Sequence, residues 1–155
     1  MSFVSKRALA LVVPVAGALV GTAAAPAHAA GDLYGAIAVA WGTSAGLAVD
    51  YPSQAAADKA AVEACGTNRC LVMARARNEC ASVAEYDHWT VWKNSVEPVY
   101  GTGLGPTRAA AEQAAMDSGH YNLSFPTTAT ASALGLIRIV KPLFILDTIC
   151  TSNAD

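Results

Sequence analysis

Charged residues are scarce in this chain of 155 residues, where Asp, Glu, Lys and Arg together make up only 14%. The formal net charge is -2, and it becomes -4 if Lys6 and Arg7 are lost with an N-terminal leader. Such a chain lacks the basic surface that attracts nucleic acid or anionic lipid headgroups. We therefore expect neither of these as its main partner.

Residues that carry catalytic or metal chemistry are also few. His28 lies in the expected leader, and the remaining histidines, His88 and His120, stand in neither a His-x-x-x-His nor a Glu-x-x-His pattern. The Gly-x-Ser-x-Gly sequence Gly42-Thr-Ser-Ala-Gly46 falls at the expected turn between two strands, whereas a nucleophile elbow lies between a strand and a helix. Glu85 and Asp87 lie close to His88, but we interpret this group as a solvated strand end. We expect no catalytic residue, no metal and no cofactor.

A glycine-rich segment, Gly101-Thr-Gly-Leu-Gly105, precedes an expected helix, as phosphate-binding loops do. It lacks the Lys-Ser/Thr pair of a P-loop, and its glycine spacing is not that of a dinucleotide-binding fold. We interpret the segment as a tight turn.

The N-terminus is typical of a secretory signal peptide. An apolar run from Leu9 to Val20 follows two basic residues, and the small-x-small sequence Ala27-His28-Ala29 ends the segment. The run is too short and too rich in Ala and Gly for a membrane span of about 20 strongly apolar residues. We expect residues 1–29 to be removed near Ala29, which leaves residues 30–155 as one secreted, extracellular domain.

Two segments that lie 54 positions apart, residues 52–65 and 106–119, resemble each other throughout. Alanines alone prove little, but several substitutions keep their chemistry: Ser53/Thr107, Asp58/Glu112, Val62/Met116 and Glu63/Asp117. We interpret the resemblance as an internal repeat, with copies at about residues 34–80 and 86–150.

Both segments are predicted to be helices. Ser53 and Thr107 are suitable N-caps, because each follows a proline that cannot continue a helix backwards. One face of each helix carries only small side chains and can approach either a sheet or the other helix: Ala56, Ala57, Ala60, Ala61 and Ala64, and Ala110, Ala111, Ala114, Ala115 and Ser118.

Strands are predicted around these helices, and Pro142 indicates an edge or a bend in the last of them. Residues 121–135 are Thr/Ala-rich and are expected to form a loop. The prediction is an α+β fold with a duplicated β-β-α-β unit, antiparallel-rich sheets, two Ala-faced helices and two disulfides. The expected strands are residues 34–41, 46–51, 71–77, 89–92, 96–100 and 137–149.

The repeat also favours one disulfide pairing. Four cysteines in an exported domain predict a disulfide framework with three possible connectivities. Cys65 and Cys70 both lack a counterpart in the second copy, whereas Cys80 corresponds to Cys150 once the inserted segment is counted. We predict Cys65–Cys70 and Cys80–Cys150.

Aromatic residues gather in one short region. If exposed, they could stack on sugar rings or fill a partner's pocket. Strand alternation favours core packing for one face, with Trp89 and Val91 on one side and Thr90 and Trp92 on the other. The aromatic residues are Tyr86, Trp89, Trp92 and Tyr100.

We also expect residues 134–146 to form a buried strand, not a membrane-associated segment.

Three features of the chain stand out together: Tyr34-Gly-Ala-Ile-Ala, the Ala-rich helix ending at Cys65, and Cys70-Leu-Val-Met-Ala-Arg-Ala-Arg-Asn-Glu-Cys80. In these features the chain resembles a family of small secreted bacterial domains that is frequent in mycobacteria, domain-of-unknown-function family four-one-eight-nine. The resemblance covers about residues 32–150 and implies secretion and a compact disulfide domain. It supplies no catalytic residues. The chain departs from the family pattern at Gly119 and in residues 121–135.

The expected function is a secreted, non-enzymatic module that binds an unknown protein, a host protein included, or a cell-envelope component. The alternative is a small extracellular hydrolase that uses His88 or His120 with a nearby carboxylate. A third possibility, membrane association through residues 121–146, is not favoured. The sequence leaves the oligomeric state open.

Overall fold

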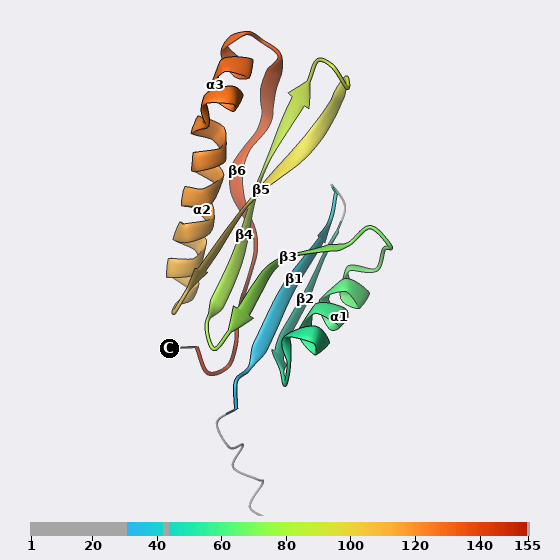
Figure 1. Ribbon diagram of the computed structural model, residues 1–155, viewed down its shortest axis with the longest axis vertical. Coiled ribbons are helices and arrows are strands. Elements are labelled where there is room, and N and C mark those ends of the chain that lie inside the picture. Colours follow the sequence, from blue (N-terminus) through green and yellow to red (C-terminus); the bar gives the residue numbers. More distant parts are fainter. Residues whose placement is uncertain (1–30, 42–43, 155) are drawn as a thin grey trace, which may run out of the picture. The chain divides into compact units, whose positions relative to one another are not determined.

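The computed structural model describes residues 31–41 and 44–154. The expected signal peptide of residues 1–29 and the turn residues Gly42 and Thr43 lie outside this part of the chain. The first half of the described domain is a three-stranded antiparallel sheet in the order β2-β1-β3, with helix α1 against one face (Figure 1). Its elements are β1 (Tyr34–Ala40), β2 (Ser44–Tyr51), α1 (Gln54–Cys65) and β3 (Leu71–Arg77).

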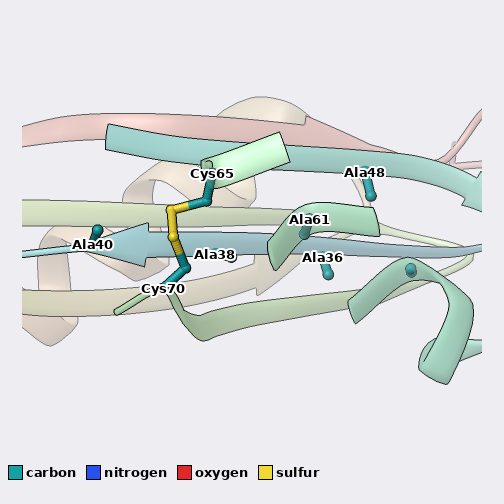
Figure 2. Close-up of a cluster of buried hydrophobic side chains, with 8 residues drawn as sticks. Ala36, Ala38, Ala40, Ala48, Ala61, Cys65 and Cys70 are labelled. Atoms are coloured by element: carbon teal, nitrogen blue, oxygen red, sulfur yellow. A yellow bond between two sulfur atoms is a disulfide. The ribbon is translucent and has the colours of Figure 1, made fainter. Parts of the chain in front are cut away.

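Helix α1 begins and ends as its sequence predicts. The Ser53 hydroxyl accepts a hydrogen bond from the Ala56 amide, and Gly66, in the left-handed region at φ 76°, caps the C-terminus. The alanine face packs on the sheet, which settles the choice between sheet and sister helix. Figure 2 shows how closely these small side chains bring helix and strands together. The buried face centres on Ala57 and Ala61, and Ala64 is exposed, contrary to expectation.

The second half is another three-stranded antiparallel sheet, in the order β5-β4-β6. Helices α2 and α3 follow one another along one face of this sheet (Figure 1). Thr107 caps α2 as Ser53 caps α1. The elements are β4 (Cys80–Thr90), β5 (Ser95–Gly105), α2 (Arg108–Ser124), α3 (Pro126–Ala133) and β6 (Ile137–Cys150).

Three expectations about the secondary structure of this half are wrong. The strand expected at residues 89–92 is the end of β4, which begins at Cys80, before the expected start of the second copy at about residue 86, and stops at Thr90. The segment 101–105 is not a turn but the end of β5, and a Cβ on Gly101 or Gly103 would lie closer than 3.0 Å to the backbone of α2. These glycines therefore permit close helix packing. The segment 121–135 is not a loop, because α2 continues to Ser124 and Pro126 opens α3.

The two sheets also pack on each other, through the faces opposite to the helices. Alternation along β1 directs Ala36 and Ala38 towards α1, and Ile37 and Val39 into a second cluster shared with strands of the other sheet. The layers of the domain, from one side to the other, are therefore helix α1, the first sheet, the second sheet, and helices α2 and α3. This second cluster contains Ile37, Val39, Ala74, Ala76, Ala81, Val83 and Ile149.

Both predicted disulfides are present. Cys65–Cys70 joins the C-terminus of α1 to the start of β3, with a Cα–Cα distance of 6.2 Å. Cys80–Cys150 links directly paired positions of β4 and β6, across a sequence separation of 70. The α+β fold, with its antiparallel sheets and two disulfides, is thus confirmed.

Strand β6 is an edge strand, as Pro142 indicates, since among the strands of residues 31–41 and 44–154 it pairs only with β4. The expectation that residues 134–146 are buried is wrong for the first part of this run. Residues 138–142 are exposed, and Leu134 is 68% exposed. No helix in the described residues is long and apolar enough to cross a membrane.

Candidate functional site

A pocket of about 610 Å³ lies on the helix-facing side of the second sheet, near the tip of the β4–β5 hairpin; we call it the hairpin-tip pocket. It lies in the half of the domain whose sheet has the longer strands. Strand β4 has 11 residues where β1 has 7, and β6 has 14 where β3 has 7. The pocket is lined by Tyr86, His88, Trp92, Val99, Asn122, Phe125, Thr127, Thr128, Ala131, Leu136 and Ile137.

Alternation along β4 places Tyr86 and His88 in the pocket. Ala84 pairs with Gly101, the glycine that packs against α2, so even-numbered residues of β4 face the helices. Tyr86, 2% exposed, and His88 continue this face towards the hairpin tip and line the pocket. Asp87 points to the opposite face, although it neighbours His88 in sequence.

The junction of α2 and α3 forms the opposite wall. Asn122 near the end of α2 donates a hydrogen bond from Nδ2 to the Tyr100 carbonyl of β5, 3.2 Å away, which ties the helix to the sheet. Phe125 occupies the single position between α2 and α3 and packs edge-on against Tyr121, with a ring centroid distance of 5.8 Å. Sequence reasoning missed this wall, because it assigned the segment to a loop.

The polar groups in the pocket are hydroxyl, amide, indole and imidazole groups. None of the lining side chains is a carboxylate, an ammonium or a guanidinium. Burial raises the pKa of the Tyr86 phenol, which favours its protonated, uncharged form. The His88 Nδ1 atom is buried and has no hydrogen-bond partner among the described residues, which is a costly state for a ring nitrogen.

Large apolar side chains are exposed around the mouth of the pocket. Trp92 is 60% exposed and Phe125 is 45% exposed. The expectation that Trp92 and Thr90 lie on the same face of a strand is wrong. Thr90 is buried, and β4 ends there, so Val91 and Trp92 follow in a turn. Two further hollows, of about 570 and 380 Å³, share Ile137 and Leu136 respectively with the pocket. Apolar exposure is therefore concentrated at this end of the second sheet.

On the other face of β4 lies a separate polar group. Glu85 is 6% exposed and lies 3.8 Å from the Lys141 ammonium. Burial first, and the charge of Asp87 second, raise the pKa of Glu85, while Lys141 and a hydrogen bond from Tyr100 act against this shift. Glu85 does not line the hairpin-tip pocket. The expectation that Glu85, Asp87 and His88 form a solvated strand end is wrong for Glu85.

The structure does not bring the two histidines into one site. His88 lines the pocket, whereas His120 is exposed on α2 and is not among the lining residues. In the described part of the chain, no hydrogen bond or ion pair joins either histidine to a carboxylate. The same residues contain no group of three or more His, Cys, Asp or Glu side chains that could hold a metal ion.

Comparisons with known proteins place the chain in a family without an assigned activity. Protein Rv1269c of Mycobacterium tuberculosis and Protein Mb1300c of Mycobacterium bovis are each 40% identical to it over 87 residues. The match covers 56% of this chain and 61% of each relative, so the chain spans less than two thirds of their length. No solved structure matches it. A family model described as "Domain of unknown function (DUF4189)" matches residues 34–124, and the chain therefore belongs to this family.

Proposed function

We propose that this protein is a secreted, non-enzymatic module that binds a protein or a cell-envelope component through the hairpin-tip pocket. One observation carries the proposal: a pocket of about 610 Å³ is lined by no Asp, Glu, Lys or Arg and has the exposed Trp92 and Phe125 in its wall. Ligand sites are typically concave, of about 300–1,000 Å³, mainly apolar, and furnished with a few polar groups. Exposed aromatic side chains beside such a pocket are typical anchors in recognition.

Binding is favoured over hydrolysis by the surroundings of His88. A histidine that acts as a general base needs a second group to orient it and a nucleophile or water within reach. Asp87, the nearest carboxylate in sequence, lies on the opposite face of β4. In the described residues, His88 Nδ1 has no partner that would fix its tautomer. The hydrolase alternative gains no support from this geometry.

The cysteines support the location outside the cell. Two disulfides are typical of an oxidising compartment. The basic, apolar and small-x-small segments of residues 1–29 supply the export signal in this proposal. Mass spectrometry of the exported protein should give a chain that begins at or near Ala30. A chain that keeps Met1 in the membrane fraction would contradict export.

The internal repeat is part of the same proposal. The two halves share the strand order in which the first strand is central and the helix precedes the last strand. A Cβ on Gly46 would meet Ala61 and Cys65, and one on Gly101 would meet Ala115 and Gly119, which lie 54 positions further along. This agreement of contacts supports a duplication whose second copy was lengthened to form a binding site.

The test compares two exposed tryptophans. Trp92 is 60% exposed at the pocket, and Trp41 is 61% exposed at the tip of the other sheet. The mature, oxidised protein is mixed with the envelope fraction and with the secreted proteins of the producing cells, and binding is measured by co-sedimentation and pull-down. We expect Trp92→Ala to lose binding and Trp41→Ala to retain it. Equal binding by both variants would rule out this pocket.

A further inference from the structure

We propose that the outer edge of β2 is a self-association surface, through which two copies of this chain pair as antiparallel strands. The proposal is independent of the hairpin-tip pocket, because none of the residues that line the pocket lies in β2. In the order β2-β1-β3, strand β2 pairs with β1 on one side, and no strand of residues 31–41 and 44–154 lies on its other side. The outward N–H and C=O groups of such an edge form a template for another strand.

The other three edge strands carry features that discourage pairing, whereas this part of β2 does not. Charged residues and prolines on an edge strand are the usual protection against the addition of a further strand. The segment Ser44–Val49 contains neither. An edge without this protection is expected to be covered in the native assembly. The protecting residues of the other edges are Arg75 and Arg77 in β3, Glu97 and Pro98 in β5, and Arg138, Lys141 and Pro142 in β6.

Helix α1 covers one face of β2 but not its edge. A Cβ on Gly46 would meet the Ala61 carbonyl and the backbone of Cys65, so the helix lies directly over the strand. Side chains of a strand point out of the sheet, whereas its N–H and C=O groups point sideways to the neighbouring strands. The helix therefore protects the face that carries Gly46 and leaves the sideways groups open to a partner strand.

Two apolar side chains on the opposite face favour a second copy as the occupant. Leu47 is 40% exposed and Val49 is 43% exposed. Leu47 pairs with Ile37 and shares its face, but neither Leu47 nor Val49 belongs to the cluster around Ile37 that joins the two sheets. Two antiparallel β2 strands are related by a two-fold axis, so the same surface serves on both sides. Leu47 and Val49 of the two copies then lie next to each other and become buried, and no charge in Ser44–Val49 opposes the approach.

Sedimentation equilibrium of the mature, oxidised protein tests the proposal directly. We expect a monomer–dimer equilibrium between micromolar and millimolar concentration. Leu47→Lys places like charges next to each other in the dimer and should weaken it about tenfold or more. Val96→Lys in the edge strand β5, where Val96 is 54% exposed, is the matched control and should leave the dimer unchanged. A wild-type monomer at millimolar concentration would overturn the proposal, as would equal effects of the two variants.

Hydrogen exchange identifies the edge through which the dimer forms. At millimolar concentration, the outward amides of residues 45–49 should exchange more slowly in the wild type than in Leu47→Lys. The outward amides of β5 should exchange alike in both proteins. Slower exchange at β5 or β6 in place of β2 would contradict the proposal. Circular dichroism verifies that each variant is folded, and Val49→Lys supplies the same test if Leu47→Lys does not fold.

Discussion

The two halves of this domain share one strand order and differ in what lies at the hairpin end of each sheet. In the first half, a helix of 12 residues covers strands of 7 and 8 residues, and Cys65–Cys70 fastens the helix end to β3. In the second half, strands of 11 and 14 residues extend further, and α2 continues for 17 residues. The first half is thereby filled with alanine, whereas the second holds a pocket.

The difference is concentrated at one helical position. Cys65 ends α1 and is bonded to Cys70. The matching residue of α2, Gly119, instead packs against Leu143 of β6, where a Cβ would lie closer than 3.0 Å to the leucine side chain. Without the disulfide, and with His120 in place of the capping Gly66, α2 continues past this contact through Asn122 to Ser124. Asn122 and the following Phe125 form a wall of the pocket. A disulfide and the hairpin-tip pocket thus lie at corresponding ends of two similar units.

Removing the disulfides should produce the largest and most unequal effects. Cys80–Cys150 closes a loop with a sequence separation of 70, and its loss as a double Ala variant should cost about 4 kcal/mol of unfolding free energy. Cys65–Cys70 has a separation of 5, and its loss should cost about 2 kcal/mol. Urea unfolding of both variants tests this order. A larger loss for the Cys65–Cys70 pair would show that local fastening of α1 outweighs the long link.

The glycines that meet the helices test whether the two halves are packed alike. Gly46→Ala and Gly101→Ala each place a Cβ against helix backbone, which should cost about 1–3 kcal/mol in either half. Thr102→Ala, at an exposed site in β5, is the matched control and should change the unfolding free energy much less. Thermal melting compares all three. A loss of stability in only one of the two glycine variants would contradict the view that the two halves are packed alike.

The pH dependence of stability should come in part from the second half, through Glu85. Burial and the charge of Asp87 raise the pKa of Glu85, and Lys141 and Tyr100 lower it by less. The folded state therefore binds the Glu85 proton more tightly than the unfolded state does. This contribution is complete below the ordinary value of 4.5 and is lost as pH rises through the raised pKa. Glu85→Gln should therefore lose less stability than the wild type between acid and neutral pH. Urea unfolding across this range measures the slopes, and parallel slopes would contradict the assignment.

The smallest stability effect is expected at the pocket itself. Trp92 is exposed, and its replacement by Ala should change the unfolding free energy by about 0.5 kcal/mol or less, as at Trp41. Differential scanning calorimetry measures both. A loss of several kcal/mol for Trp92→Ala alone would mean that this side chain stabilises the fold, not a complex.

Local signals in the sequence were sufficient for most of the fold. Ser53 and Thr107 follow prolines, so the helix starts could be predicted, and the unequal copies led to the disulfide pairing. Helix α3 was missed because it buries no residue and so leaves no apolar periodicity. The strand at residues 101–105 was missed because glycine, placed at alternate positions for helix contact, also signals turns.

The pocket could be predicted only in part. Tyr86, His88 and Trp92 stand out in the sequence, and alternation along a strand relates the first two. Their partners Asn122 and Phe125 come from a helix junction that composition does not reveal. Long-range packing brings these residues together, and no single segment encodes it.

The central claim is that the second half carries a binding site that the first half lacks. NMR spectra of the ¹⁵N-labelled mature protein test it most directly, because the indole groups of Trp41, Trp89 and Trp92 report on both sheets at once. During titration with solubilised envelope material of the producing cells, the Trp92 indole and the amides of β4 and α3 around the pocket should shift. The Trp41 indole and α1 should not. Shifts confined to the first half, or spread equally over both halves, would contradict the claim.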